Sequence, residues 1–177
     1  PLDSGSMICI ATIDEEKPWV LTSEPVVISR PLYAWENHSG TINNEGPYPL
    51  ILGDEIFLSY SGGDACGPAY VVGYLRAKVT DDLLNPKSWK KEPTAMLHLM
   101  SVKNRLGQGH NSFFKDENGK LMIAYHAQER EKYNCRCSAY HRVHISKSGL
   151  PLLNVSDERD LPEEMQNVKM RFALASL

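Results

Sequence analysis

The sequence contains no long apolar run and no cluster of basic residues. Its apolar stretches, such as those at residues 25–28 and 56–58, are far shorter than the roughly 20 residues of a membrane-spanning helix. The formal net charge at pH 7 is −3, from 19 Lys and Arg against 22 Asp and Glu. We therefore expect neither a nucleic acid nor a membrane as a partner.

The start of the sequence lacks the charged and apolar regions of a signal peptide, and Met7 follows six residues that do not resemble a native beginning. We therefore expect residues upstream to be missing. Cysteine is also scarce, and the spacing of Cys9, Cys66, Cys135 and Cys137 suggests neither a disulfide framework nor a standard zinc site. Reduced thiols favour a cytoplasmic protein, whereas a signal upstream of residue 1 would make it secreted.

Long runs with the helical period of 3.6 residues are scarce, whereas short runs rich in β-branched and aromatic residues are common. They are bounded by Gly, Pro, Asn and Asp, and hairpin turns are expected at residues 53–54 and 116–119. The sequence therefore predicts an all-β protein. The expected strands are residues 7–13, 55–60, 70–77, 121–125 and 138–145.

The strands belong to an internal repeat. Residues 45–60 match residues 110–125 without a gap, and each stretch contains a Gly turn and a strand that ends in Tyr. A third strand follows in both units, and residues 7–13 fit the third strand of an earlier unit. Trp-bearing loops at residues 14–19 and 82–89 then lead into outer strands near Leu21 and Met96.

A four-stranded unit that recurs every 65 to 70 residues is typical of a β-propeller blade. The alternative is a pair of similar hairpins in a β-sandwich, but the matched Trp loops favour blades. Glu45 and His110 hold equivalent positions in neighbouring units, at the start of the innermost strand. Because such positions converge on the propeller axis, we expect both side chains to face one pocket.

Several motifs in this order resemble glycoside hydrolase family 43, the five-bladed propeller family of β-xylosidases, α-L-arabinofuranosidases and arabinanases. The resemblance runs from about Met7 to Leu153. The motifs are Trp35-Glu36, Glu45-Gly46-Pro47, Gly107-Gln108-Gly109-His110, Ala124-Tyr125-His126-Ala127 and His141-Arg142. Many members have Gly-Pro-Gly-His where this chain has Gly-Gln-Gly-His, which is a mild departure.

The resemblance implies an inverting mechanism in which Glu45 is the general acid. The general-base Asp and the Asp that tunes the acid would lie upstream of Pro1, so neither is assigned to this chain, and Asp3 is too late in the sequence to be the second. A general acid needs burial or a nearby negative charge to hold its proton. The aromatic residues around Glu45 suit both the burial of the acid and stacking on a sugar ring. Trp35 and Asn44 are expected to bind substrate. A surface Glu before a strand is the plainer alternative.

His110 and Arg142 are further substrate-binding candidates. The resemblance implies that His110 approaches a bound water or a metal, often calcium, in the central channel, although no cofactor is required for catalysis. A lone His is more commonly a buried core residue whose ring nitrogens are hydrogen-bonded within the protein. The resemblance also implies that Arg142 holds substrate, since a guanidinium suits hydroxyl and carboxylate contacts. A surface strand Arg is the alternative.

The chain of 177 residues provides about two and a half blades, in residues 1–156, followed by a closing strand, short helix or tail at residues 157–177. Three partners could complete it: N-terminal blades of the same polypeptide, blades on a second chain, or further copies of itself. The first functional hypothesis is an inverting glycosidase acting on arabinose- or xylose-containing oligo- or polysaccharides. The second is a non-catalytic carbohydrate-binding or self-associating propeller fragment.

Overall fold

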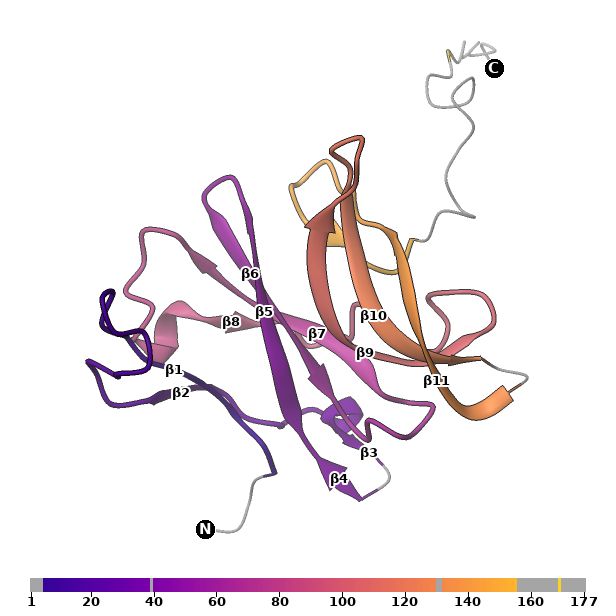
Figure 1. Cartoon of the computed structure of the whole chain (residues 1–177), viewed down its shortest axis with the longest axis horizontal. Coiled ribbons are helices and arrows are strands. Elements are labelled where there is room, and N and C mark those ends of the chain that lie inside the picture. The colour runs from indigo at the N-terminus through magenta and orange to yellow at the C-terminus, as the bar shows by residue number, and fades with distance from the viewer. Residues whose placement is uncertain (1–4, 39, 130–131, 156–168, 170–177) are drawn as a thin grey trace, which may run out of the picture.

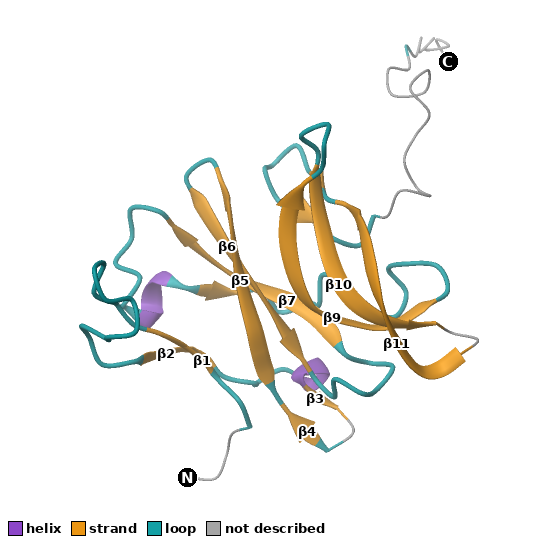
Figure 2. Cartoon of the chain, viewed as in Figure 1, coloured by secondary structure: helices purple, strands orange, loops and turns teal. Residues whose placement is uncertain are grey.

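A computed structural model describes residues 5–38, 40–129, 132–155 and 169 of the chain. Within this part the regular structure consists of antiparallel strands and two short 3-10 helices, η1 (Ala34–Glu36) and η2 (Pro86–Ser88), as Figure 2 shows. The all-β prediction is therefore confirmed. No helix in the described ranges is long and apolar enough to cross a membrane. The predicted element at residues 157–177 lies outside the described residues, apart from Lys169.

The first complete blade is a four-stranded antiparallel sheet. Its strands are, in spatial order, β5 (Asn44–Leu52), β6 (Glu55–Gly62), β7 (Val71–Lys78) and β8 (Lys90–Lys91). The predicted turn joins β5 to β6, and Gly53 takes a φ of 62° that glycine adopts without a steric penalty. The outer edge continues as a bridge between Val72 and Leu97, next to the predicted outer strand near Met96.

The second complete blade repeats this arrangement. Its sheet contains β9 (Arg105–Lys115), β10 (Leu121–Glu129) and β11 (Lys132–Arg142), and β12 (His144–Ile145) pairs with β13 (Pro151–Leu152) to form the outer edge. The strand predicted at residues 138–145 starts earlier and breaks at Val143, whose backbone N–H instead donates to Leu121 O at 2.8 Å. Figure 1 shows the β5–β6 hairpin in purple beside the β9–β10 hairpin in orange.

The half blade lies at the N-terminal side of the first complete blade. It contains β1 (Ile8–Ile10) paired with β2 (Val26–Ser29), and a bridge joins Ile13 to Leu21 as the predicted outer strand requires. The short pair β3 (Asn37–His38) and β4 (Thr41–Ile42) follows η1 and leads into β5. The described chain therefore forms a four-stranded blade, a second blade made of a three-stranded sheet and a two-stranded outer pair, and one two-stranded part of a blade.

Two apolar clusters hold these units together. Between the complete blades lies a core of eleven buried residues: Leu50, Phe57, Val72, Tyr74, Leu97, Phe113, Ile123, Tyr125, Ala127, Val143 and Leu153. The repeat-equivalent Tyr48 and Phe113 meet edge to face at 6.0 Å between ring centroids. A smaller cluster joins the half blade to the first complete blade through Ile8, Ile28, Tyr60 and Leu75. The starts of β5 and β9 are thereby fixed relative to each other.

Candidate functional site

Glu45 lies at an irregularity near the start of β5. It pairs with Ser61, but the register between β5 and β6 shifts before Tyr48. Gly46 takes a φ of 57° at this point, a left-handed conformation that favours glycine, and Pro47 follows it. Such a bulge re-aims the neighbouring side chain and is common beside functional sites. The Glu-Gly-Pro order thus gives the half-buried Glu45 its direction.

The Glu45 carboxylate is held by Tyr70. The Tyr70 hydroxyl donates to Glu45 Oε1 at 2.6 Å, and the Tyr70 side chain is fully buried. Burial, and then the hydrogen bond to Glu45, raise the pKa of Tyr70, so the phenol keeps the proton that it donates. A Cβ on Gly109 would lie 2.0 Å from the Tyr70 ring, which explains why glycine occupies that position.

His110 lies directly beside the backbone that follows Glu45. A Cβ added to Gly46 would meet the His110 ring at 3.1 Å. The His110 backbone N–H donates to Ser61 Oγ at 2.7 Å, and its φ of 52° is unusual for a residue with a side chain. The structure therefore brings His110 next to Glu45, and the exposed imidazole remains accessible to a ligand.

His126 and Arg136 complete the cluster. The His126 ring stacks on the Tyr70 ring, with 5.2 Å between centroids and 11° between planes. Arg136 Nη1 lies 3.3 Å from His126 Nε2. Burial, followed by the charges of Arg136 and His110, lowers the pKa of His126 to about 4. At neutral pH the imidazole is therefore uncharged, and its Nε2 can accept the Arg136 hydrogen bond.

Sequence reasoning missed Tyr70, His126 and Arg136 as site residues. The repeat contained a signal for one of them, because His126 is equivalent to Ser61, which holds the His110 backbone. Tyr70 precedes a strand and Arg136 lies within one, and neither is marked by a motif. Their contribution depends on the packing of β7 and β10 around β9, which a sequence pattern does not specify.

Comparison with known proteins identifies the family. A sequence model of glycosyl hydrolases family 43 matches residues 4–151. The chain belongs to this family.

Several family relatives share this part of the sequence. The extracellular exo-α-(1→5)-L-arabinofuranosidase of Streptomyces avermitilis is 34% identical over 125 residues, which cover 70% of this chain and 25% of that protein. The α-L-arabinofuranosidase B of Pyricularia oryzae is 30% identical over 128 residues, covering 72% of this chain and 26% of that protein. The chain thus spans about a quarter of the length of these relatives.

A solved structure extends the likeness to three dimensions. The α-L-arabinofuranosidase from Lactobacillus brevis matches with a TM-score of 0.75 and 30% identity, over 86% of this chain and 48% of that one. The chain therefore forms part of a five-bladed β-propeller, as the repeat and the resemblance predicted. It spans about half of that relative, and its Glu45 cluster lies where two neighbouring blades of the family propeller meet.

Asn44 is buried and Trp35 is half-buried, and the side chains of both are engaged in contacts with other residues. Asn44 is 1% exposed, and its amide is engaged by Glu36, Ser29, Lys91 and the carbonyl of Asn43. The half-buried Trp35 ring stacks between Tyr33 and Tyr60, and its Nε1 donates to Pro93 O at 2.9 Å. Both side chains therefore belong to the packing around the start of β5.

Arg142 lies toward the other end of its blade. It pairs with Met122, whereas His126 in the cluster pairs with Ser138, four residues away along β11. At ~3.3 Å per residue, this separates the two positions by about 13 Å along the strand. The arginine that reaches the cluster is Arg136, which pairs with Gln128, two pairs beyond His126 in the direction away from Arg142.

The resemblance also implied a metal, often calcium, near His110. Calcium prefers about six to eight oxygen ligands, whereas this place offers one imidazole and the Glu45 carboxylate. In the described part of the chain no three His, Cys, Asp or Glu side chains gather as a metal site would require. The residues present therefore do not fit calcium by themselves.

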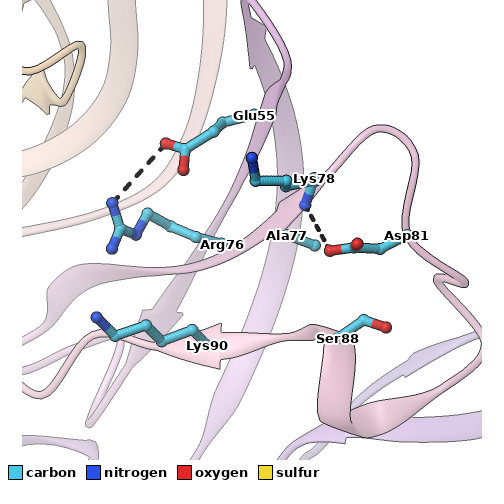
Figure 3. A pocket seen from close by; sticks show the side chains of 7 residues that line it. All are labelled: Glu55, Arg76, Ala77, Lys78, Asp81, Ser88 and Lys90. Atoms are coloured by element: carbon cyan, nitrogen blue, oxygen red, sulfur yellow. Dashed lines mark hydrogen bonds and ion pairs between the residues drawn. The ribbon is translucent and has the colours of Figure 1, made fainter.

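A small open pocket lies at the opposite end of the first complete blade (Figure 3). Its lining residues are Glu55, Arg76, Ala77, Lys78, Asp81, Ser88 and Lys90. Glu55 is six residues along β6 from Ser61, the partner of Glu45, or about 20 Å at the usual strand rise. The pocket is therefore separate from the Glu45 cluster, and its Arg76 is already paired with Glu92 at 2.9 Å.

Proposed function

We propose that this chain provides the general acid, Glu45, of an inverting glycosidase acting on arabinose- or xylose-containing oligo- or polysaccharides. The observation that carries the proposal is the pairing of the Glu45 carboxylate with Tyr70, next to an exposed His110 from the neighbouring blade. The membership of family 43 supports the reaction class. Because the chain spans a quarter to a half of its relatives, the activity belongs to a completed propeller.

In this reaction the protonated Glu45 carboxyl would deliver its proton to the oxygen of the departing sugar. A second carboxylate, on the other face of the sugar ring, would activate a water at about 6.5–9.5 Å from the first. That base is not assigned to this chain. Tyr70 orients the carboxyl group, since its buried hydroxyl has one direction of approach, and a fixed acid lowers the entropic cost of proton transfer.

Substrate hydroxyl groups would be held by His110 and Arg136. His110 is exposed beside Gly46, and the Arg136 guanidinium is exposed while one of its nitrogens is held by His126. Arg142 is the weaker candidate because of its distance along β11, and we assign Asn44 and Trp35 a supporting role. If a metal binds in the channel, His110 would provide one ligand and the others would come from outside the described residues.

Arabinofuranosides are the first substrates to test. The three relatives described above are at least 30% identical to this chain and are named arabinofuranosidases. The type of glycoside that this chain accepts is our proposal. One of these relatives is named extracellular, so the cytoplasmic location expected from the cysteines stays a prediction. All four cysteines are free thiols in the structure.

A second function, carbohydrate binding without turnover, is favoured by one observation. The side chains proposed to hold sugar, His110 and Arg136, are both exposed, and no base is assigned in the sequence given. Such a site would bind sugar without turnover, and the chain would pair with a second chain or with further copies of itself.

The decisive experiment compares the wild-type chain with Glu45→Gln. Light scattering and intact mass first establish whether the protein is a monomer, an oligomer or a complex with other blades. Release of free pentose from α-(1→5)-linked arabino-oligosaccharides and β-(1→4)-linked xylo-oligosaccharides, whose poor leaving groups require a proton, is then measured for both proteins. We expect turnover by the completed wild type and a loss of at least about 100-fold in Glu45→Gln. Equal rates would refute Glu45 as the acid, and sugar binding without turnover in both would support the second function.

A further inference from the structure

A buried carboxylate lies behind the strand that carries Glu45. Glu36, the last residue of η1, is 0% exposed. Its Oε1 accepts hydrogen bonds from Tyr60 Oη at 2.8 Å and Asn44 Nδ2 at 2.8 Å, and its Oε2 accepts from the backbone N–H of Tyr33 at 2.7 Å. Lys91 Nζ pairs with Oε1 at 2.5 Å. A buried charge is tolerated only with such full compensation.

The cation of this pair reaches the same asparagine. Lys91, in the outer strand β8, also donates to Asn44 Oδ1 at 3.2 Å and to the carbonyl of Arg30. Burial lowers the pKa of Lys91, while the hydrogen bond and the charge of Glu36 oppose that change. The pair therefore connects η1, the outer strand and the segment after β2 through one buried point.

Asn44 is fixed from four directions. Its Nδ2 donates to Glu36 and to the carbonyl of Asn43, and its Oδ1 accepts from Lys91 and from Ser29 Oγ at 2.6 Å. Asn44 is the first residue of β5, and successive side chains of a strand point to opposite faces. Asn44 thus anchors the strand from one face, while Glu45 projects from the other toward Tyr70.

Glu45 needs this anchor because the regular pairing between β5 and β6 is interrupted directly after Glu45. The register between β5 and β6 is regular at Asn44 and Glu45 and then shifts before Tyr48, around Gly46. A bulge with glycine is locally permissive, so pairing beyond Glu45 does not define the direction of its side chain. What defines it is the strand start, and hence Asn44.

We propose that Glu36 and Lys91 are positioning residues for Glu45, which hold its strand through Asn44 so that its carboxylate meets Tyr70. The inference depends on the role proposed for Glu45, although the contact that it explains exists whatever reaction the site performs. Glu36 is fully buried and Lys91 pairs with it, so we class both as positioning residues and not as catalytic ones.

The test uses the full chain and reads the Glu45–Tyr70 contact directly. A buried tyrosine hydroxyl bound to a carboxylate at 2.6 Å should give a downfield, slowly exchanging proton resonance in NMR, assigned by its absence in Tyr70→Phe. In Glu36→Gln we expect this resonance to move upfield and its proton to exchange roughly fivefold to tenfold faster. Ser29→Ala, which removes one hydrogen bond to Asn44, should move it in the same direction by less.

Two controls separate positioning from general loosening. Glu55→Gln makes the same chemical change at the far end of the same blade, and Tyr125→Phe loosens the neighbouring blade. Both should leave the resonance at its wild-type position.

The proposal is overturned if Glu36→Gln and Ser29→Ala lower the melting temperature while the Tyr70 resonance stays unchanged, or if wild type shows no such resonance. Should Glu36→Gln fail to fold, Ser29→Ala decides. Failure of the proposed function appears separately, as equal turnover by wild type and Glu45→Gln, and does not affect this measurement.

Discussion

The two complete blades share one hairpin geometry but anchor it with different polar groups. Tyr60 and Tyr125 hold equivalent positions at an offset of 65 residues, and both are buried. Tyr60 donates to the ion-paired carboxylate of Glu36, whereas Tyr125 bonds to His141 Nδ1 at 3.1 Å. His141 Nε2 in turn donates to the carbonyl of Leu153 at 2.9 Å. One blade is held by a buried charge pair, and the other by hydrogen bonds that pass through a buried histidine.

The difference shows that the repeat specifies where side chains lie and leaves their chemistry free. Asn44 and Gly109 are equivalent positions just before Glu45 and His110. The side chain of Asn44 is hydrogen-bonded at both its oxygen and its nitrogen, whereas Gly109 has no side chain and so leaves space for the Tyr70 ring. The blade that carries the proposed acid has the stronger anchor behind its strand. The blade that carries His110 instead provides the space that Tyr70 occupies.

The largest effect is expected from breaking the charge pair. Glu36→Ala leaves Lys91 partly buried without its carboxylate, a change that costs about 3–5 kcal/mol of unfolding free energy in buried pairs. We expect the lower end, about 3 kcal/mol, because Lys91 keeps some access to water. Urea denaturation followed by circular dichroism measures it. A loss below about 1 kcal/mol would mean that the pair does not anchor this blade.

The matched tyrosines sharpen the comparison. Tyr60→Phe removes one hydrogen bond from a buried carboxylate and should cost about 1.5–3 kcal/mol, because bonds to charged groups contribute more. Tyr125→Phe removes a hydrogen bond to the His141 imidazole and should cost about 1 kcal/mol. The same denaturation experiment compares the two variants. Equal costs would contradict the distinction between a carboxylate anchor and a histidine anchor.

The glycine before His110 tests the space that Tyr70 requires. In Gly109→Ala the new methyl group would lie 2.0 Å from the Tyr70 ring, so the ring must move. Overpacking of this kind costs about 1–3 kcal/mol, and the displaced hydroxyl should lose its contact with Glu45. Thermal unfolding and the Tyr70 hydroxyl resonance report the two effects. An unchanged resonance would show that the ring has room elsewhere.

The sequence predicted the blades and the meeting of Glu45 with His110, because both follow from hydrophobic alternation and a 65-residue offset. Substrate binding by Asn44 and Trp35 stays a prediction, because their residue types suit sugar binding while in the structure Asn44 is buried and the half-buried Trp35 donates to Pro93. Sequence reasoning missed Tyr70, because the hydroxyl reaches Glu45 only after β7 packs beside β9. Local patterns specify strands and turns, whereas contacts between strands far apart in the sequence depend on packing.

His126 makes the unfolding free energy depend on pH through one blade only, because its equivalent in the other blade, Ser61, does not titrate between pH 4 and 7. The folded pKa of about 4 lies below the ordinary value of about 6.5, so the unfolded chain binds the proton first. The stabilisation is complete above about pH 6.5 and is lost as the pH falls toward 4. Discounted for partial exposure, we expect about 1–2 kcal/mol between pH 7 and 4. His126→Phe keeps a ring on Tyr70 but cannot titrate, so its denaturation free energies should fall less over this range. Parallel curves for the two proteins would show that His126 is not held neutral by its burial and by Arg136.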